Sequence, residues 1–272
     1  GPGQLALLAF HRRHPHSAAY NMVFAIEVPA GLRFGLLKQA VRHVVDCHEA
    51  LHSGFIEEDG EIVMARPAGF AAEISLTRAD DLDEAGLQAW FEREADEPFD
   101  PDAGQVCRFR FLVSRQADGN DRMWMCAGMH HIAGDYLGFE LVCDQIFATY
   151  EALCANRPPM ASQVGRYRDW LVRQRQLLAG PRGASLRAHW EGVLEDAPAA
   201  PALPGTLYAE PRHRGAEIEF HLTPQQTNGL RELATRLEAS VFVVMLALFK
   251  TVLHRASGED DFLVGTPTAG RS

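Results

Sequence analysis

The sequence lacks several features that would assign it to a particular class of protein. No run of apolar residues approaches the length that a helix crossing a bilayer needs, so we expect no membrane partner. The opening residues, Gly1 to Gln4, do not have the layout of a signal peptide. The formal net charge of -10 argues against nucleic acid as a partner, because a nucleic-acid surface needs clustered cations.

Cysteine is scarce and its spacing is uninformative. The five cysteines are odd in number and form no Cys-x-x-Cys pair. Most stand among apolar residues, where a free cysteine behaves as a small hydrophobic side chain. We therefore expect a cytoplasmic protein with neither a disulfide framework nor a zinc site. His11, His14 and His16 lie in a polar, basic run that we expect to be a solvated segment rather than a metal site.

Apolar residues follow strand-like and helix-like periods in turn, which predicts a mixed α/β fold. The predicted strands are residues 19–28, 55–56 with 62–64, 108–113, 123–129, 216–222 and 261–264. The predicted helices are residues 34–51, 82–95, 138–153, 163–179, 183–195, one that begins at 223–224, and 241–249. We divide the chain into a first lobe (1–155), a helical bridge and linker (156–204) and the start of a second lobe (205–272).

The second lobe is expected to be incomplete. Its apolar helix, 241–249, must bury all its faces, yet only one further strand is predicted after it. A sheet of so few strands cannot cover such a helix. The sequence therefore predicts a fragment of a longer domain.

The strand 123–129 is apolar on both faces, so we expect it to be central and covered on both sides. It leads directly into His130 and His131, and Asp135 precedes the next helix. Imidazole can accept a proton from an attacking nucleophile near neutral pH. The alternative is a buried, hydrogen-bonded histidine followed by an aspartate that caps the helix. Adjacent residues of an extended chain point in opposite directions, so at most one histidine faces a given site.

Several ordered motifs resemble those of condensation domains from nonribosomal peptide synthetases. Residues 130–135 are similar to the His-His-x-x-x-Asp core of that family. Further similar segments are Gln4 with residues 7–10, then 17–22, 48–51 with Phe55, 97–100, 167–190 and 264–271. The resemblance spans nearly the whole chain.

This resemblance implies a chloramphenicol-acetyltransferase-like lobe, an α+β two-layer sandwich, followed by an incomplete second lobe. It also implies an acyltransferase that joins a donor acyl or peptidyl thioester to an acceptor aminoacyl thioester. Both substrates would be held on phosphopantetheine arms of carrier proteins, with adenylation or polyketide synthase modules as possible neighbours and no bound cofactor or metal. His131 would be catalytic and His130 structural. Asp135 would shape the loop that Gly134 and Tyr136 also form.

The sequence departs from the family pattern at three positions. Tyr136 replaces the glycine that usually follows the aspartate. His52 and Cys47 replace the two arginines of the motif Arg-His-Glu-x-Leu-Arg-Thr-x-Phe. We predict that His52 lies close enough to Asp135 to take over part of the missing arginine's role, and a histidine can do so only when protonated.

Other functions share parts of this pattern. An acyltransferase of the same fold that uses coenzyme A or a carrier also has His-x-x-x-Asp. Epimerisation domains share the double histidine but fit the opening segment less well, and cyclisation domains carry aspartates in place of the histidines. A degenerate interaction module without catalysis would explain Tyr136, His52 and Cys47, although the intact His131 argues against it.

Overall fold

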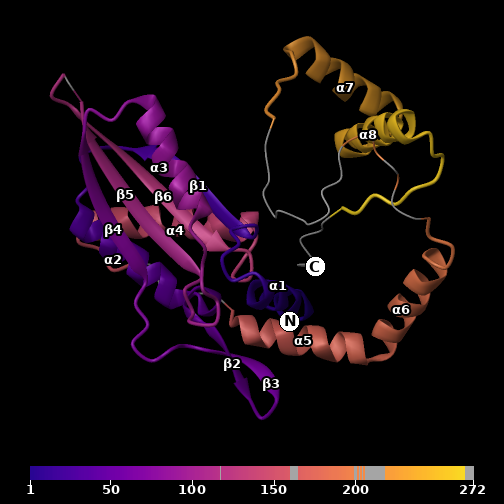
Figure 1. Cartoon of the computed structure of the whole chain (residues 1–272), viewed down its shortest axis with the longest axis horizontal. Helices are drawn as coiled ribbons and strands as arrows, with labels where there is room; N and C mark the ends of the chain where they lie inside the picture. Colours follow the sequence, from indigo (N-terminus) through magenta and orange to yellow (C-terminus); the bar gives the residue numbers. More distant parts are fainter. Residues whose placement is uncertain are drawn as a thin grey trace. The chain divides into compact units, whose positions relative to one another are not determined.

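The computed structural model describes residues 1–116, 118–159, 165–198, 201, 203, 205 and 218–266 (Figure 1). The chain forms two compact units, Gly1–Gln174 and Arg175–Ser272. Parts of the predicted linker 197–205, residues 216–217 of a predicted strand and residues 267–271 of the last motif lie outside the described residues. The three-part division of the chain stays a prediction.

A four-stranded mixed sheet forms the centre of the first unit. Its strands are β1 (Asn21–Val28), β4 (Glu73–Asp80), β5 (Cys107–Arg115) and β6 (Asp121–His130), in the order β1-β6-β5-β4. Strand β6 runs antiparallel to both of its neighbours, whereas β4 and β5 are parallel. The last eight residues of β6 are all buried, which confirms that this strand is central. Strand β4 was not predicted from the sequence.

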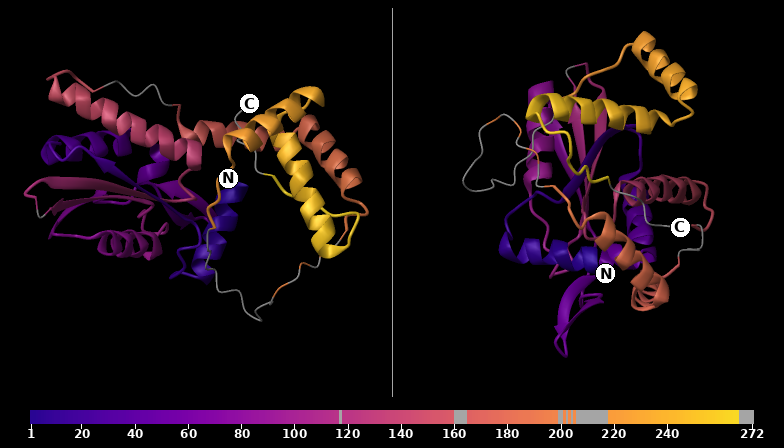
Figure 2. Two further views of the ribbon diagram at one scale, coloured as in Figure 1. Left: turned by 90° about the horizontal axis from the view of Figure 1, so that it is seen from above. Right: turned by 90° about the vertical axis from the view of Figure 1, so that its right-hand side faces the viewer.

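Helices cover both faces of the sheet (Figure 2, left). Helices α2 (Phe34–Cys47) and α4 (Tyr136–Cys154) pack on one face and bury the main apolar core. Helix α3 (Glu84–Asp96) packs on the other face, where Trp90 contacts the side of the sheet that carries Leu112 and Trp124. Each fully buried large apolar side chain contributes about 1.5–3 kcal/mol to folding, so this double cover holds β6 rigidly in place.

The start of the unit differs from the expectation. Residues Pro2–Arg13 form helix α1, and His11 lies on its buried face with Gln4 and Leu8. The prediction of a solvated segment was therefore wrong for His11. Helix α1 is placed by Leu8, which packs with Phe55, Val106 and Ile132.

A short 3-10 helix, η1 (Glu49–His52), follows α2, so the predicted helix 34–51 ends earlier as an α-helix, at Cys47. The predicted hairpin forms from β2 (Gly54–Glu58) and β3 (Glu61–Ala65). Its two turn residues, Asp59 and Gly60, have φ angles of 51° and 78°. Such positive angles suit a two-residue hairpin turn and are typical of an Asp-Gly pair.

Helix α5 (Tyr167–Ala179) crosses the boundary between the units, and the described part of the second unit otherwise contains α6 (Pro181–Val193), α7 (Pro224–Arg236) and α8 (Val241–Ser257). The side chains of Thr223 and Ser240 cap α7 and α8. The predicted strands 216–222 and 261–264 were wrong: their described residues form no ladder. A strand needs a partner for its backbone groups, and the described residues of this unit provide none.

Among the described residues no single helix is long and apolar enough to span a membrane. Helices α7 and α8 together have the length and composition of a span, but the pair is bent by 104°. Much of α8 is exposed, including Phe242 and Val252, each 61% exposed.

Candidate active site

Strand β6 places the two histidines of the motif in different environments. His130 is the last residue of the strand and is only 4% exposed, whereas His131 follows it and is exposed. His130 still lies in the strand, whose last eight residues are buried on both faces, whereas His131 lies in the turn that follows it. The structure confirms that His131 lies just past a central strand.

His130 has a fixed protonation pattern. Its Nδ1 accepts a hydrogen bond of 3.0 Å from the backbone nitrogen of Ile132, so in the neutral ring the proton is on Nε2. Burial lowers the pKa of His130 to about 4, and the neighbouring His11 and His131 act in the same direction. The rings of Tyr20 and Phe99 also lie beside it, with centroids 6.3 and 6.4 Å away. His130 is therefore neutral at pH 7 and holds the loop by accepting a hydrogen bond.

Backbone hydrogen bonds fix the loop that carries His131. The His131 nitrogen donates to the carbonyl oxygen of Tyr20 at 2.9 Å, and the Ala133 nitrogen donates to that of His130 at 2.9 Å. The side-chain amide of Gln4 donates to the carbonyl oxygen of Ile132 at 3.0 Å. The exposed imidazole of His131 is thus presented from a backbone that is held on both sides.

Asp135 ends this loop and begins the next helix. Its Oδ1 accepts a hydrogen bond of 2.8 Å from the nitrogen of Gly138, which makes it the N-cap of α4. Gly134 lies close to Met129, because a Cβ at this glycine would come within 2.9 Å of the Met129 sulfur. Asp135 and Gly134 thus both shape the loop.

Tyr136 occupies the first position of α4 and is 59% exposed. Its ring packs edge-on against Phe24 of β1, with centroids 5.6 Å apart. Its backbone is helical and has no positive φ angle, so the position does not require the glycine that the family pattern would place there. The tyrosine changes the surface beside the loop without straining the backbone.

His52 lies beside an aromatic ring at the end of η1. Its own ring is 6.1 Å from that of Phe70, and its buried Nδ1 has no hydrogen-bond partner among the residues that the structure describes. Its motif neighbours make long-range contacts: His48 pairs with Gln145 of α4 at 2.6 Å, and Glu49 pairs with Arg168 of α5. The pairing of His52 with Asp135 stays a prediction.

One group of side chains behind the loop has the composition of a cation site. In the described part of the chain, His11, Asp100 and Asp102 bring potential ligand atoms within 4.8 Å of one another. The Asp102 carboxylate already accepts hydrogen bonds of 3.1 and 2.7 Å from the guanidinium of Arg12. The guanidinium of Arg12 thus already neutralises the Asp102 carboxylate. We therefore describe His11, Asp100 and Asp102 as part of an ion-pair cluster and not as a metal site.

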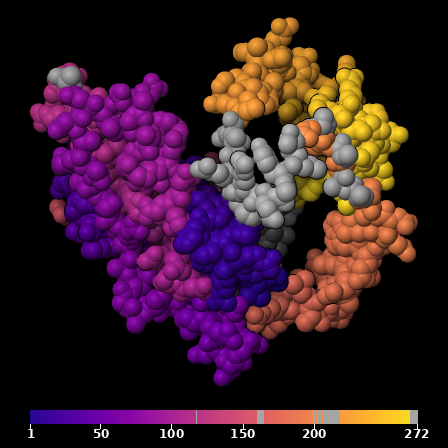
Figure 3. All heavy atoms as spheres, viewed as in Figure 1, coloured from indigo at the N-terminus to yellow at the C-terminus, as the bar shows by residue number. Residues whose placement is uncertain are grey.

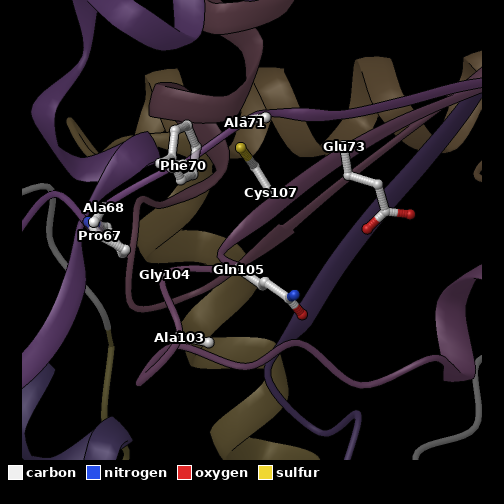
Figure 4. A pocket seen from close by; sticks show the side chains of 10 residues that line it. Pro67, Ala68, Phe70, Ala71, Glu73, Ala103, Gly104, Gln105 and Cys107 are labelled. Atoms are coloured by element: carbon white, nitrogen blue, oxygen red, sulfur yellow. The ribbon is translucent and has the colours of Figure 1, made fainter.

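A hollow of about 400 Å³ lies between the segments before β4 and before β5 (Figure 4). Residues 67–71 and 103–105 line it together with Glu73 and Cys107, and His131 is not among the lining residues. Burial raises the pKa of Cys107 to about 12, so its thiol stays protonated and is a poor nucleophile. The carboxylate of Glu73 pairs with Arg110. The reactive group of the site therefore remains His131.

The sequence predicted that at most one of the two histidines faces a given site, and the structure buries one and exposes the other. The groups that hold the loop were not predicted. The sequence analysis named Gln4 only as part of the opening motif, and it assigned no role to the carbonyl group of Tyr20. The signal for Gln4 was its spacing with Leu8 and His11, which places all three on one face of a helix.

Comparison with known proteins identifies the family. The family described as Condensation domain matches residues 2–272. Phosphinothricin tripeptide synthetase PhsB from Streptomyces viridochromogenes is 33% identical over 282 residues, which cover 97% of this chain and 22% of that protein. The dimodular nonribosomal peptide synthase from Bacillus subtilis is 26% identical over 264 residues, which cover 94% of this chain and 11% of that protein.

The fold is shared with solved condensation domains. The first condensation domain of the calcium-dependent antibiotic synthetase, in complex with substrate analogue 2a, has a TM-score of 0.78 and 24% identity. That match covers 99% of this chain and 63% of the solved chain, so this chain spans less than two thirds of its structural relative. The predicted fold class is confirmed. Because the family match extends over nearly all of its residues, this chain belongs to the condensation domain family.

Proposed function

We propose that this chain supplies the general-base lobe of a condensation domain that forms amide bonds in nonribosomal peptide synthesis. In this reaction the amine of an acceptor aminoacyl thioester attacks the carbonyl of a donor acyl or peptidyl thioester. The new C–N bond replaces the C–S bond, and the donor arm leaves as a thiolate that takes up the proton lost by the amine. The enzyme is an acyltransferase that needs no bound metal or redox cofactor for this exchange.

The observation that carries the proposal is the exposed imidazole of His131 on a rigid backbone. The strand before it is buried on both faces, and hydrogen bonds hold the residues on either side of it. A thioester is already activated, so the protein contributes mainly by aligning the reactants and receiving the proton. An exposed imidazole at a fixed position can do both.

The neighbours of His131 act by holding the loop. His130 is neutral and accepts the Ile132 hydrogen bond, and Asp135 caps α4. Tyr136 presents an exposed ring beside the loop, at the start of the helix that follows it. We infer that these three residues shape the site around His131.

The substrates and partners follow from the family. The relatives are peptide synthetases by name, and we propose that this chain likewise acts on thioesters carried by donor and acceptor carrier proteins in the cytoplasm. It spans 63% of the solved condensation domain with which it shares its fold. We therefore propose that the active unit is longer than these residues.

The test measures product formation in the longer protein that includes this chain. Donor and acceptor carriers are loaded, and the acceptor-bound amide product is followed by intact-protein mass spectrometry. The His131→Ala variant should form product roughly a hundredfold more slowly, because general-base catalysis contributes about this factor. His189→Ala removes an exposed histidine from α6 and should have no effect. Equal rates for wild type and His131→Ala would refute the general-base role.

A further inference from the structure

Helix α1 lies against the loop that carries His131, and the proposed function assigns it no role. Its buried residues are Gln4, Leu8 and His11, one turn apart along a single face. Leu8 packs against Ile132, and the His11 ring lies 6.3 Å from that of His130. The rest of the helix is largely open to solvent, as the N-terminal atoms in Figure 3 show. The inner face of α1 is therefore built around this loop.

Gln4 makes the most specific of these contacts. It is 7% exposed, and its Nε2 donates to the carbonyl oxygen of Ile132 at 3.0 Å and lies 3.7 Å from the Met64 sulfur. The contact with Ile132 joins residues far apart in the sequence.

The Ile132 peptide groups are thereby held at both ends. Its nitrogen donates to His130 Nδ1, and its carbonyl accepts from Gln4. His130 contacts only the backbone nitrogen of Ile132. Without Gln4, the buried carbonyl oxygen of Ile132 therefore has lost its side-chain donor. A buried carbonyl oxygen without a hydrogen-bond donor raises the free energy of the folded loop. Conformations of the loop in which this oxygen finds another donor therefore become more populated. Ile132 is the next residue after His131, so such a rearrangement moves the imidazole.

We propose that Gln4 is a positioning residue for His131, and that its side-chain amide fixes the loop in the geometry that proton transfer needs. This inference rests on the proposed function for its catalytic consequence. Gln4 does not reach the reacting atoms; it acts through the Ile132 carbonyl. A displacement of the imidazole by about 1 Å lowers a rate by roughly ten- to a hundredfold, whereas it leaves the binding of a large carrier protein unchanged.

The test compares Gln4→Met with Ser114→Ala. Methionine keeps the length of the side chain and its packing but cannot donate to a carbonyl. Ser114 is fully buried, and its hydroxyl accepts a hydrogen bond from Leu82 at the end of β5 remote from the loop. This control thus loses a partly buried hydrogen bond elsewhere in the same unit. Gln4→Glu provides a second variant of equal length if the methionine variant fails to fold.

Two measurements separate positioning from general stability. In the longer protein, Gln4→Met should lower kcat at saturating loaded carriers by roughly tenfold or more while KM for the carriers stays within about twofold of wild type. Ser114→Ala should leave both constants unchanged at a temperature where both variants are folded. In this chain alone, amide hydrogen exchange at residues 131–133 should become about tenfold faster in Gln4→Met only.

The outcomes distinguish this inference from the proposed function. If His131→Ala loses activity but Gln4→Met retains wild-type kcat, the positioning role is wrong and the general-base role stands. If His131→Ala keeps its activity, the proposed function fails, and hydrogen exchange alone decides whether Gln4 fixes the loop. Exchange at residues 131–133 that is unchanged in Gln4→Met overturns the inference in either case.

Discussion

Acidification should destabilise the first unit through a single buried residue, His130. Burial lowers its pKa from 6.5 to about 4, so the folded protein binds this proton less tightly than the unfolded chain does. Between pH 6.5 and pH 4 the His130 side chain is protonated in the unfolded chain but stays neutral in the folded state. The free energy of unfolding therefore falls as the pH falls through this window, by roughly 3 kcal/mol in total.

The His130→Asn variant isolates this contribution. The Asn side-chain oxygen lies at about the same distance along the side chain as Nδ1, so it can still accept the hydrogen bond from Ile132, but it does not titrate. The variant should lose the His130 part of the pH dependence, about 1.4 kcal/mol per pH unit at its steepest. At neutral pH it should be less stable than wild type, because the smaller side chain leaves a cavity.

The assay is urea unfolding at a series of pH values between about 7 and 4.5, followed by the fluorescence of the buried Trp90 and Trp124. His189→Asn is the control, because it removes an exposed histidine from α6 and leaves His130 and the groups around it in place. If His130→Asn shows the same pH dependence as wild type, His130 is not the group that resists protonation. In that case its proposed neutral, hydrogen-bond-accepting role fails.

Three further predictions concern the loop and the extent of the chain. Asp135→Ala should cost about 1 kcal/mol in urea unfolding through loss of the α4 cap, while Asp135→Asn should cost only a few tenths; equal costs would show that the cap is not what Asp135 supplies. His52→Arg should preserve or raise stability by pairing with Asp135, and an Asp135→Asn background should abolish any gain in a double-mutant cycle. The purified chain alone, given loaded carriers, should form no amide product by mass spectrometry, because it spans only 63% of the solved condensation domain whose fold it shares; robust turnover by the monomer would show that these residues suffice.

The parts of the fold that the sequence predicted are those with strong local patterns. Strand β6 has an unbroken apolar run, and α2 repeats apolar residues at helical spacing, so both were found. Helix α1 has only one apolar residue, Leu8, among its three buried positions, so the pattern of apolar residues did not indicate a helix there. In β4 only Ile74 and Leu76 alternate with polar residues, which is a short signal for an edge strand.

The candidate site divides in the same way. His130 ends the buried strand and is itself buried, whereas His131 just past it is exposed, and the sequence predicted that at most one of the two faces a given site. The low pKa of His130 and the Gln4 contact depend on segments distant in sequence, and no local pattern encodes them. The wrong strands at 216–222 and 261–264 have a related cause. A suitable composition does not form a strand without a partner, and the described residues supply none.

The pairing of β1 with β6 sets the order in which the site can assemble. Asn21 pairs with His130, so the edge strand that is synthesised first must wait for one made much later. Closing such a long loop is slow, because its entropy is lost before the contacts that reward it form. During synthesis on the ribosome, β1 therefore emerges long before β6, its neighbour in the described sheet. Until β6 forms, the backbone groups of β1 that pair with it lack their partners and are open to wrong pairings, and Phe24 and Ile26 of this strand remain exposed even in the folded unit.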